Sequence, residues 1–309
     1  MKVLKSIDDY SSHKESFLTI GTFDGLHIGH KAILKKLITK AKSKNANSVV
    51  LTFFPHPRTV LQNDKSINLI DTLKEKEDLL NNLGIDVLII QPFTLEFSKL
   101  SAQKFTRDVL VKKLNVSKLF IGYDHRFGKN RTASVPELIS FGDTYGFSVE
   151  VIPAQDIDTI SVSSTKIRKA LLDGDINLAN EFLGRSYQVQ GLVFHDQGLG
   201  SKIGFPTANI KINEKYKVLP KPGVYWVSMF WNNKKYYGML NFGNRPSVSG
   251  KKRTMEIHFF NFDYNLYDKI IKVSFLSKIR EEKKFDSIES LKVQLEVDKE
   301  FCYELEKNI

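Results

Sequence analysis

The chain has 309 residues, 41% of them hydrophobic, which is enough for about two domains with buried cores. Its net charge is +11, but lysines alternate with acidic residues, so we expect a solvated basic surface and no nucleic-acid partner. A single cysteine, Cys302, excludes an internal disulfide and a cysteine-rich zinc site. The chain has no apolar signal core or membrane-length hydrophobic run, which predicts a cytoplasmic protein without a membrane partner.

Residues 1–184 alternate between apolar strands and amphipathic helices. Strands are predicted at Phe17–Ile20, Ser48–Phe54, Asp86–Gln91, Lys118–Gly122 and Ser148–Ile152. Helices are predicted around Ile33–Ile38 and at Leu73–Asn82, Ser101–Lys113, Pro136–Tyr145 and Ser163–Leu172. The alternation is typical of a Rossmann-like α/β domain, whose parallel sheet is covered on both faces and binds ligands outside the carboxyl ends of its strands.

The first strand leads into a glycine-bearing turn and then a helix, an arrangement that favours phosphate binding at the helix N-terminus. His27 and His30 lie three residues apart at this point and could both donate hydrogen bonds to a polyphosphate. Gly29 between them would let the phosphate approach the backbone. The pair could instead be two core histidines or half of a metal site.

Three further segments of this half follow strands. The two prolines of Phe54–Pro57 predict a stiff extended wall, or else an ordinary strand exit. The glycine-bounded loop Gly122–Arg131 could stack a flat ring and contact phosphate, or could be solvated. In Ser163–Arg168 the hydroxyl groups and Arg168 could bind the same anion. Alternatively, the hydroxyl groups do no more than cap a helix.

The run Gly21–His30 resembles the phosphate-binding signature of the His-x-Gly-His nucleotidyltransferase superfamily. With the Phe-x-Pro-x-Pro, Gly-x-Asp-x-x-Phe-Gly and Ser-Ser-Thr-x-x-Arg runs, this half resembles the FAD synthetase module of bacterial bifunctional riboflavin kinase/FAD synthetase. The resemblance implies that His27, His30 and Arg168 are catalytic and that ATP phosphates contact Gly21, Phe23, Asp24, Gly25, Gly29, Ser164 and Thr165. It places the flavin at Phe54, Pro55, Pro57, Asp124, Phe127 and Gly128. The implied attack of an ionised FMN phosphate on ATP requires no general base.

Residues 185–309 change to short, aromatic-rich strands. These are predicted at Tyr187–Phe194, Gly223–Phe230, Lys235–Asn241, Thr254–Phe260 and Ile270–Lys278. The pattern predicts a small antiparallel β-barrel. Apolar residues spaced from Ile288 to Leu305, including Val297 and Phe301, predict a C-terminal helix that packs on the barrel, with Cys302 as a passive residue on it.

A glycine-rich loop precedes the run Gly204–Asn209. Thr207 and Asn209 point the same way if this segment is extended, and both offer oxygen ligands suited to Mg²⁺. A glycine-rich hairpin with a Pro-Thr turn is the alternative. The run resembles the riboflavin kinase Pro-Thr-Ala-Asn motif, and further matching segments follow in that family's order up to Phe285.

This second resemblance implies a kinase site. ATP phosphates would contact Gly198, Gly200, Lys202 and Gly204, Mg²⁺ would bind Thr207 and Asn209, and the flavin would contact Asn241 and Arg280. Riboflavin attacks through a neutral hydroxyl, for which Glu256 is the implied general base, unless it is a solvent-facing strand residue. The sequence departs from the family pattern at Gly198–Ser201, which lacks a basic residue, and at Asn244, where threonine is usual.

We therefore expect an FAD synthetase domain at residues 1–184 and a riboflavin kinase domain at 185–309. The expected ligands are riboflavin, FMN, FAD, ATP, ADP and pyrophosphate, with Mg²⁺. The alternatives are a chain with one surviving activity, an adenylyl transfer to another phosphorylated acceptor, or a flavin- or RNA-binding regulator on the same scaffold.

Overall fold

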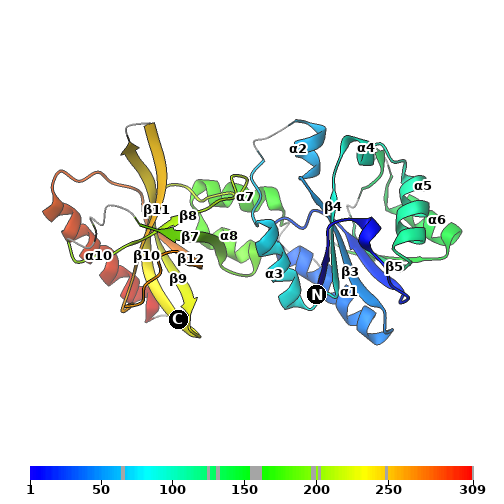
Figure 1. The fold of residues 1–309 in the computed structure, drawn as a ribbon, viewed down its shortest axis with the longest axis horizontal. Coiled ribbons are helices and arrows are strands. Elements are labelled where there is room, and N and C mark those ends of the chain that lie inside the picture. The colour runs from blue at the N-terminus through cyan, green and yellow to red at the C-terminus, as the bar shows by residue number, and fades with distance from the viewer. Residues whose placement is uncertain are drawn as a thin grey trace. The chain divides into compact units, whose positions relative to one another are not determined.

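The computed structural model describes residues 1–63, 67–123, 126–129, 133–153, 162–195, 200, 203–247 and 250–307, without the side chains of 244–247 and 250–253. The chain forms two compact units, Met1–Ser164 and Thr165–Ile309. The first is an α/β sheet structure and the second is a β-barrel with helices (Figure 1).

A six-stranded parallel sheet forms the centre of the first unit. Its strands, in spatial order, are β1 (Lys2–Leu4), β4 (Val87–Pro92), β3 (Asn47–Phe54), β2 (Ser16–Ile20), β5 (Val116–Gly122) and β6 (Ser148–Ile152). Strand β2 pairs with β3 on one side and with β5 on the other, and the order of the strands changes direction here. Ligands of such sheets bind outside the carboxyl ends of the strands at this switch point.

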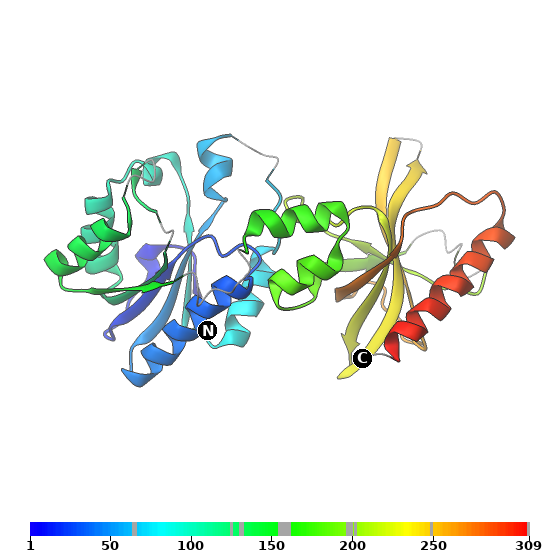
Figure 2. The same cartoon turned by 180° about the vertical axis from the view of Figure 1, so that it is seen from behind.

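Helices cover both faces of this sheet. They are η1 (Ile7–Asp9), α1 (Ile28–Ser43), α2 (Pro57–Leu61), α3 (Leu73–Leu83), α4 (Leu95–Ser98), α5 (Ala102–Lys104), the π-helix η2 (Phe105–Lys113) and α6 (Val135–Tyr145). Leu34 of α1 and Leu80 of α3 pack in a cluster with Phe17, whereas Leu110 of η2 packs in a second cluster with Leu18. Consecutive residues of β2 thus face opposite helix layers. Figures 1 and 2 show the two layers, with α1 and α3 on one side of the sheet and α5 and α6 on the other.

Two predicted local structures of this unit are corrected. The Phe54–Pro55 bond is cis and Pro57 is the first residue of α2, so these prolines do not form an extended wall. Proline suits the first helical position because an N–H group there has no partner within the helix. Ser101 caps a helix as predicted, but the segment continues as a π-helix from Phe105.

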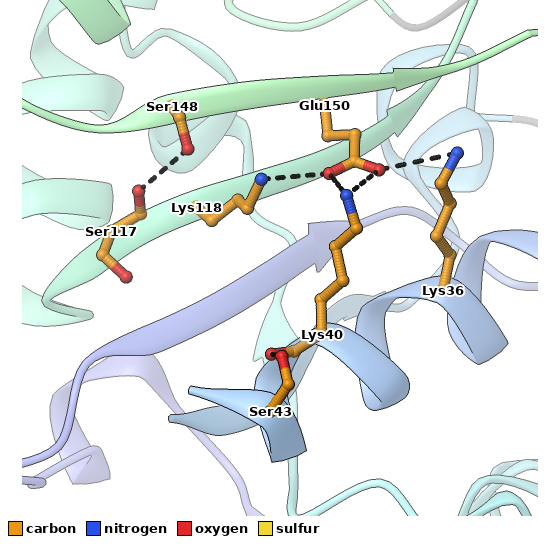
Figure 3. A network of polar contacts seen from close by, with 7 residues as sticks. All are labelled: Lys36, Lys40, Ser43, Ser117, Lys118, Ser148 and Glu150. Carbon is orange, nitrogen blue, oxygen red and sulfur yellow. Dashed lines mark hydrogen bonds and ion pairs between the residues drawn. The ribbon is translucent and has the colours of Figure 1, made fainter. Parts of the chain in front are cut away.

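A charged network anchors helix α1 to the sheet (Figure 3). Glu150 of β6 binds Lys40 of α1 at 2.7 Å, Lys118 of β5 at 3.1 Å and Lys36 of α1 at 3.5 Å. Burial alone would raise the pKa of the Glu150 carboxyl, but hydrogen bonds from Lys40 and Lys118 outweigh it and hold this pKa below its usual range. The network therefore fixes the helix that carries His27 and His30 at its N-terminal end.

The second unit is a closed antiparallel barrel. Its strands, in spatial order, are β10 (Lys234–Ser247), β11 (Gly250–Phe259), β8 (Ala208–Lys211), β7 (Tyr187–Phe194), β12 (Ile270–Arg280) and β9 (Gly223–Trp231). Its helices are α8 (Ile176–Leu183), which packs on β7 and β12, and α10 (Ile288–Glu306), which packs on β10 and β12. Helix α7 (Ser164–Asp173) begins at the last residue of the first unit.

The C-terminal helix is confirmed, but it does not use all of its apolar residues for packing. Ile288, Val297 and Phe301 are exposed, whereas Asp298 and Cys302 are buried. Cys302 is fully buried and its thiol pKa is raised by burial to about 12, in keeping with a passive role. Among the residues that the structure describes, no helix is both long and apolar enough to cross a membrane.

Candidate active sites

The chain leaves the central strand β2 through a strained turn. Phe23, Gly25 and Leu26 have φ angles of 45°, 86° and 40°. A Cβ atom on Gly25 would also lie 2.8 Å from Ile70 Cδ1, so both the backbone and the available space require glycine there. Phe23 and Leu26 hold an unfavourable conformation for their residue types, which persists only where the surroundings stabilise it.

Hydrogen bonds from three segments hold this turn. The Thr22 carbonyl accepts from Lys76 Nζ at 2.7 Å and from Thr52 Oγ1 at 3.2 Å. The Asp24 carboxylate accepts from the Ile70 N–H group at 2.8 Å, and the Asp24 carbonyl accepts from Ser164 Oγ at 2.9 Å. The turn is therefore fixed at several points, although few of its own residues form regular secondary structure.

His27 and His30 stack at the start of α1. Their ring centroids are 3.6 Å apart, and His27 Nδ1 accepts the N–H group of His30 at 3.4 Å. Burial lowers the pKa of His27 to about 4, while burial, followed by the charges of His27 and Lys76, lowers the pKa of His30. Both rings are therefore neutral at pH 7. Since His27 accepts at Nδ1, its proton lies on Nε2, where it can be donated to a ligand.

The first group of predicted residues is largely assembled at this turn. The structure brings together Gly21, Phe23, Asp24, Gly25, His27, Gly29, His30 and Ser164. Phe23 and Asp24 are buried with their side chains turned inward, at 2% and 1% exposure. Thr165 and Arg168 follow on α7 and belong to the second unit, Thr165 exposed and Arg168 half-buried.

The predicted flavin residues of this unit lie in two places. Phe54 and Pro55 connect β3 to α2, which Pro57 opens. Phe127 is buried after β5, with its ring 6.3 Å from that of Phe105 and 6.5 Å from that of Phe141.

The neighbouring residue Gly128 has φ of 74°, and a Cβ atom there would lie 3.0 Å from the backbone of Ala102. Phe127 and Gly128 thus anchor their loop on the core. Asp124 lies outside the described residues.

In the barrel, strand register aligns residues that are far apart in the sequence. Asn209 of β8 lies opposite Glu256 of β11, which lies opposite Asn241 of β10. The row continues through Val224 of β9 to Arg280 of β12. Directly paired residues on neighbouring strands place their side chains on the same face of the sheet. The barrel therefore gathers four predicted site residues in one row.

Four residues of this row, Glu256, Asn241, Val224 and Arg280, line a cavity of about 260 Å³. Its polar walls include Thr207, Asn241, Glu256 and Arg280, and Gly200 contributes backbone. The apolar walls come from barrel residues and from Leu291 and Leu295 of α10. A concave, mostly apolar space with a few convergent polar groups is the usual form of a small-molecule site.

Asn209 and Thr207 carry oxygen atoms of the kind that hard cations prefer. Asn209 is 6% exposed, and its Oδ1 atom is buried without a hydrogen-bond partner among the described residues. A buried amide oxygen in this state is costly unless something binds it. Thr207 precedes it by two residues and lines the cavity. No cluster of three or more acidic, histidine or cysteine side chains suitable for a metal occurs in the described part of the chain.

The Arg280 side chain is fixed in place by hydrogen bonds and an ion pair. Its Nε and Nη2 atoms donate to the Asp298 carboxylate of α10 at 2.9 and 2.7 Å, and its Nη1 atom donates to the Glu281 carbonyl. Asp298 is only 2% exposed and also accepts from Gln294. The guanidinium group thus ties β12 to α10 at the edge of the cavity.

The structure describes Gly200 and Gly204 of the predicted glycine-rich loop. A Cβ atom on Gly200 would lie 2.3 Å from the Phe205 carbonyl, and Gly204 has φ of 87°. Gly198 and Lys202 lie outside the described residues.

Sequence patterns missed three groups at these sites: Lys76 behind the first turn, Asp298 on α10, and His258 on the cavity wall, whose Nδ1–H group donates to the Pro206 carbonyl at 2.9 Å. Each contacts a residue distant in sequence, and no sequence pattern indicates that contact.

Comparisons with known proteins cover both units. The family model for FAD synthetase matches residues 9–166 and that for riboflavin kinase matches residues 183–305. A protein of Buchnera aphidicola subsp. Schizaphis graminum, named bifunctional riboflavin kinase/FMN adenylyltransferase, is 38% identical over 304 residues, 96% of each chain. A Haemophilus influenzae protein of the same name is 38% identical over 284 residues, 92% of each. A crystal structure described as a macrolide-efflux protein from Streptococcus pneumoniae aligns at 29% identity with a TM-score of 0.88, covering 97% of this chain and 98% of that one.

Proposed function

This chain belongs to the bifunctional riboflavin kinase/FMN adenylyltransferase family, and we propose that the two residue groups described above are its two active sites. The enzyme phosphorylates riboflavin to FMN and adenylylates FMN to FAD, with ATP as the nucleotide co-substrate. The observation that carries the assignment of residues is the row from Asn209 through Glu256 to Asn241, of which Glu256 and Asn241 line the cavity.

In the barrel, Glu256 acts as the general base. The riboflavin 5′-hydroxyl attacks the γ-phosphorus of ATP, its proton passes to the Glu256 carboxylate, and ADP leaves. A neutral hydroxyl is a weak nucleophile, so a positioned carboxylate contributes roughly 100- to 10,000-fold to such a step. Asn241 and the apolar walls orient the flavin. Arg280 shapes the cavity edge through its ion pair with Asp298.

Thr207 and Asn209 hold Mg²⁺. The Asn209 Oδ1 atom, which is buried without a hydrogen-bond partner in the described part of the chain, and the Thr207 hydroxyl supply hard oxygen ligands, which suit this cation. When bound, the ion neutralises charge on the ATP phosphates. Gly198, Gly200, Lys202 and Gly204 are proposed to surround the same phosphates.

At the turn after β2, the enzyme aligns two anions instead of moving a proton. The FMN phosphate, largely ionised at pH 7, attacks the α-phosphorus of ATP and pyrophosphate leaves. Neutral His27 and His30, the helix N-terminus and Gly29 bind the phosphates, and Ser164, Thr165 and Arg168 contribute from α7. Phe23, Asp24 and Gly25 shape the turn from within. The flavin lies near Phe54, Pro55, Pro57, Asp124, Phe127 and Gly128.

We propose a functional boundary near residue 184, whereas the compact units divide between Ser164 and Thr165. Helix α8 therefore belongs in sequence to the adenylylation half while it packs on β7 and β12 of the barrel. We also propose that the enzyme acts in the cytoplasm, without a nucleic acid or membrane partner, as expected for a cofactor-synthesising enzyme with soluble substrates.

A time course with riboflavin, ATP and Mg²⁺ tests this proposal, with flavins separated by chromatography. FMN should appear first and FAD later, and a chelator of divalent cations should stop both steps. If FMN formation continued at full rate without a divalent cation, the metal role of Thr207 and Asn209 would be wrong.

A further inference from the structure

Lys76 is a buried cation to which the chemistry above assigns no role. It lies in the first turn of α3, is 3% exposed, and donates from Nζ to the Thr22 carbonyl at 2.7 Å. Thr22 opens the strained turn that ends at His27. The lysine therefore reaches from a separate helix to the base of the phosphate-binding segment.

The position of this charge is unusual for a structural residue. A buried ammonium group loses its hydration, and burial accordingly lowers the pKa of Lys76, while the carboxylates of Asp24 and Asp71 act in the opposite direction. Both carboxylates are themselves buried, at 1% and 2% exposure. Buried charged groups, Lys76, Asp24 and Asp71, thus lie at the turn in addition to its apolar packing.

The positive charge of Lys76 also affects the electrostatics of the proposed phosphate site. Lys76 is among the groups that disfavour a positive charge on His30, whose Nδ1 atom is buried without a hydrogen-bond partner in the described part of the chain. A positive charge behind the turn attracts an anion bound in front of it, and the low-dielectric interior strengthens that attraction.

We propose that Lys76 is a positioning residue for adenylyl transfer: it holds the Thr22 carbonyl, keeps the strained turn in its phosphate-binding form and supplies buried positive charge to the polyphosphate site. This inference rests on the proposed phosphate role of the turn. Its effect should therefore fall on ATP, the polyphosphate substrate, more than on the flavin.

The test uses Lys76→Met in the full chain, because methionine fills a similar volume without a charge or a donor. The kcat/KM of FAD formation should fall roughly 10- to 100-fold, with a larger rise in KM for ATP than for FMN. Riboflavin phosphorylation, measured in the same preparation, should stay within about twofold and show that the second unit is intact. A purely structural defect in the turn would not raise the KM for ATP more than the KM for FMN.

Lys74→Met is the matched control. It makes the same substitution two residues away on α3, at a side chain that is 64% exposed and pairs with Asp78, and FAD formation should not change. Lys76→Gln keeps a hydrogen-bond donor but removes the charge. It replaces Lys76→Met if circular dichroism shows that the first unit of the methionine variant is unfolded.

Full FAD synthesis in a folded Lys76→Met or Lys76→Gln variant would overturn the inference. His30→Ala, assayed in parallel, separates this outcome from failure of the site itself. If His30→Ala abolishes FAD formation while the Lys76 variants retain it, only the role of Lys76 is wrong. If His30→Ala is also fully active, the phosphate role of the turn is wrong and the inference falls with it.

Discussion

At the scale of single residues, we propose that the turn after β2 uses its two histidines as neutral hydrogen-bond donors. Burial lowers the pKa of both His27 and His30, so neither ring is charged at pH 7, and each can donate without the hydration that an ammonium group carries. His27 is also the N-cap of α1, and its Nδ1 atom accepts the His30 N–H group. In this proposal, one imidazole caps the helix through Nδ1 and donates to the ligand through Nε2.

The depressed pKa of His27 predicts a pH dependence of stability. As the pH falls below 6.5, the unfolded chain gains a proton at this residue, whereas the folded state does not until about pH 4. Stability is therefore fully present above pH 6.5 and is lost as the pH falls towards 4. The whole difference amounts to about 3 kcal/mol.

His27→Asn should reduce this pH dependence, because an asparagine oxygen can still accept the His30 N–H group but does not titrate. Urea unfolding at pH 7 and pH 4.5 would measure it by circular dichroism. Fluorescence of Trp226 and Trp231, both in the barrel, identifies the transition of the second unit. An equal loss of stability on acidification in the variant and the parent would contradict the assignment of the effect to His27.

Lys76 and Asp298 show why some functional residues escape prediction. Each is a charged residue within an amphipathic helix, and periodicity alone would place it on a solvated face. Their burial depends on partners at Thr22 and Arg280 that are distant in the chain. Only the folded contacts reveal these residues, whereas His27, Thr207 and Glu256 lie in local motifs that can be recognised in the sequence.

At the scale of elements, the ion pair between Arg280 and Asp298 is the main polar link between β12 and α10 that we identify in the described structure. Arg280 is 15% exposed and Asp298 is 2% exposed. Helix α10 also contributes Leu291 and Leu295 to the cavity wall. The pair should therefore affect both barrel stability and flavin binding.

Asp298→Ala should destabilise the barrel by about 3 kcal/mol, because it leaves the Arg280 guanidinium buried without its carboxylate. The KM for riboflavin should rise as α10 loosens. Urea unfolding followed by tryptophan fluorescence measures the first effect. Glu296→Ala is the control on the same helix. The Glu296 side chain is 51% exposed, and its ion pair with Lys299 Nζ is long, at 3.6 Å. Equal stability of the two variants would contradict a stabilising role for the buried pair.

The predicted elements agree with the structure where hydrophobic periodicity is strong. The five predicted barrel strands are present, and β8, four residues long, is the additional strand that closes the barrel. It is too short for a clear alternating pattern, although it carries Asn209. The π-helix from Phe105 and the cis bond at Pro55 also lack a distinct periodic signal, because both depend on local hydrogen bonding and tertiary contacts.

At the scale of the whole molecule, the chain combines two sites that solve different chemical problems. We propose that the parallel sheet positions a helix N-terminus for two anionic reactants and that the barrel positions a carboxylate for a neutral hydroxyl. Motifs located both regions in the sequence. The alignment of Asn209, Glu256 and Asn241 could be seen only from strand register, since it joins three strands whose pairing the sequence does not state.

The separation of these two chemistries can be tested directly with single variants. His30→Ala, Glu256→Gln and the parent enzyme would each be incubated with riboflavin, ATP and Mg²⁺, and with FMN in a second series, and the flavins separated over time. His30→Ala should accumulate FMN without FAD. Glu256→Gln should leave riboflavin nearly unchanged yet convert supplied FMN to FAD, and a mixture of the two variants should restore the full sequence. If either variant, still folded, lost both activities, the two sites would not be independent.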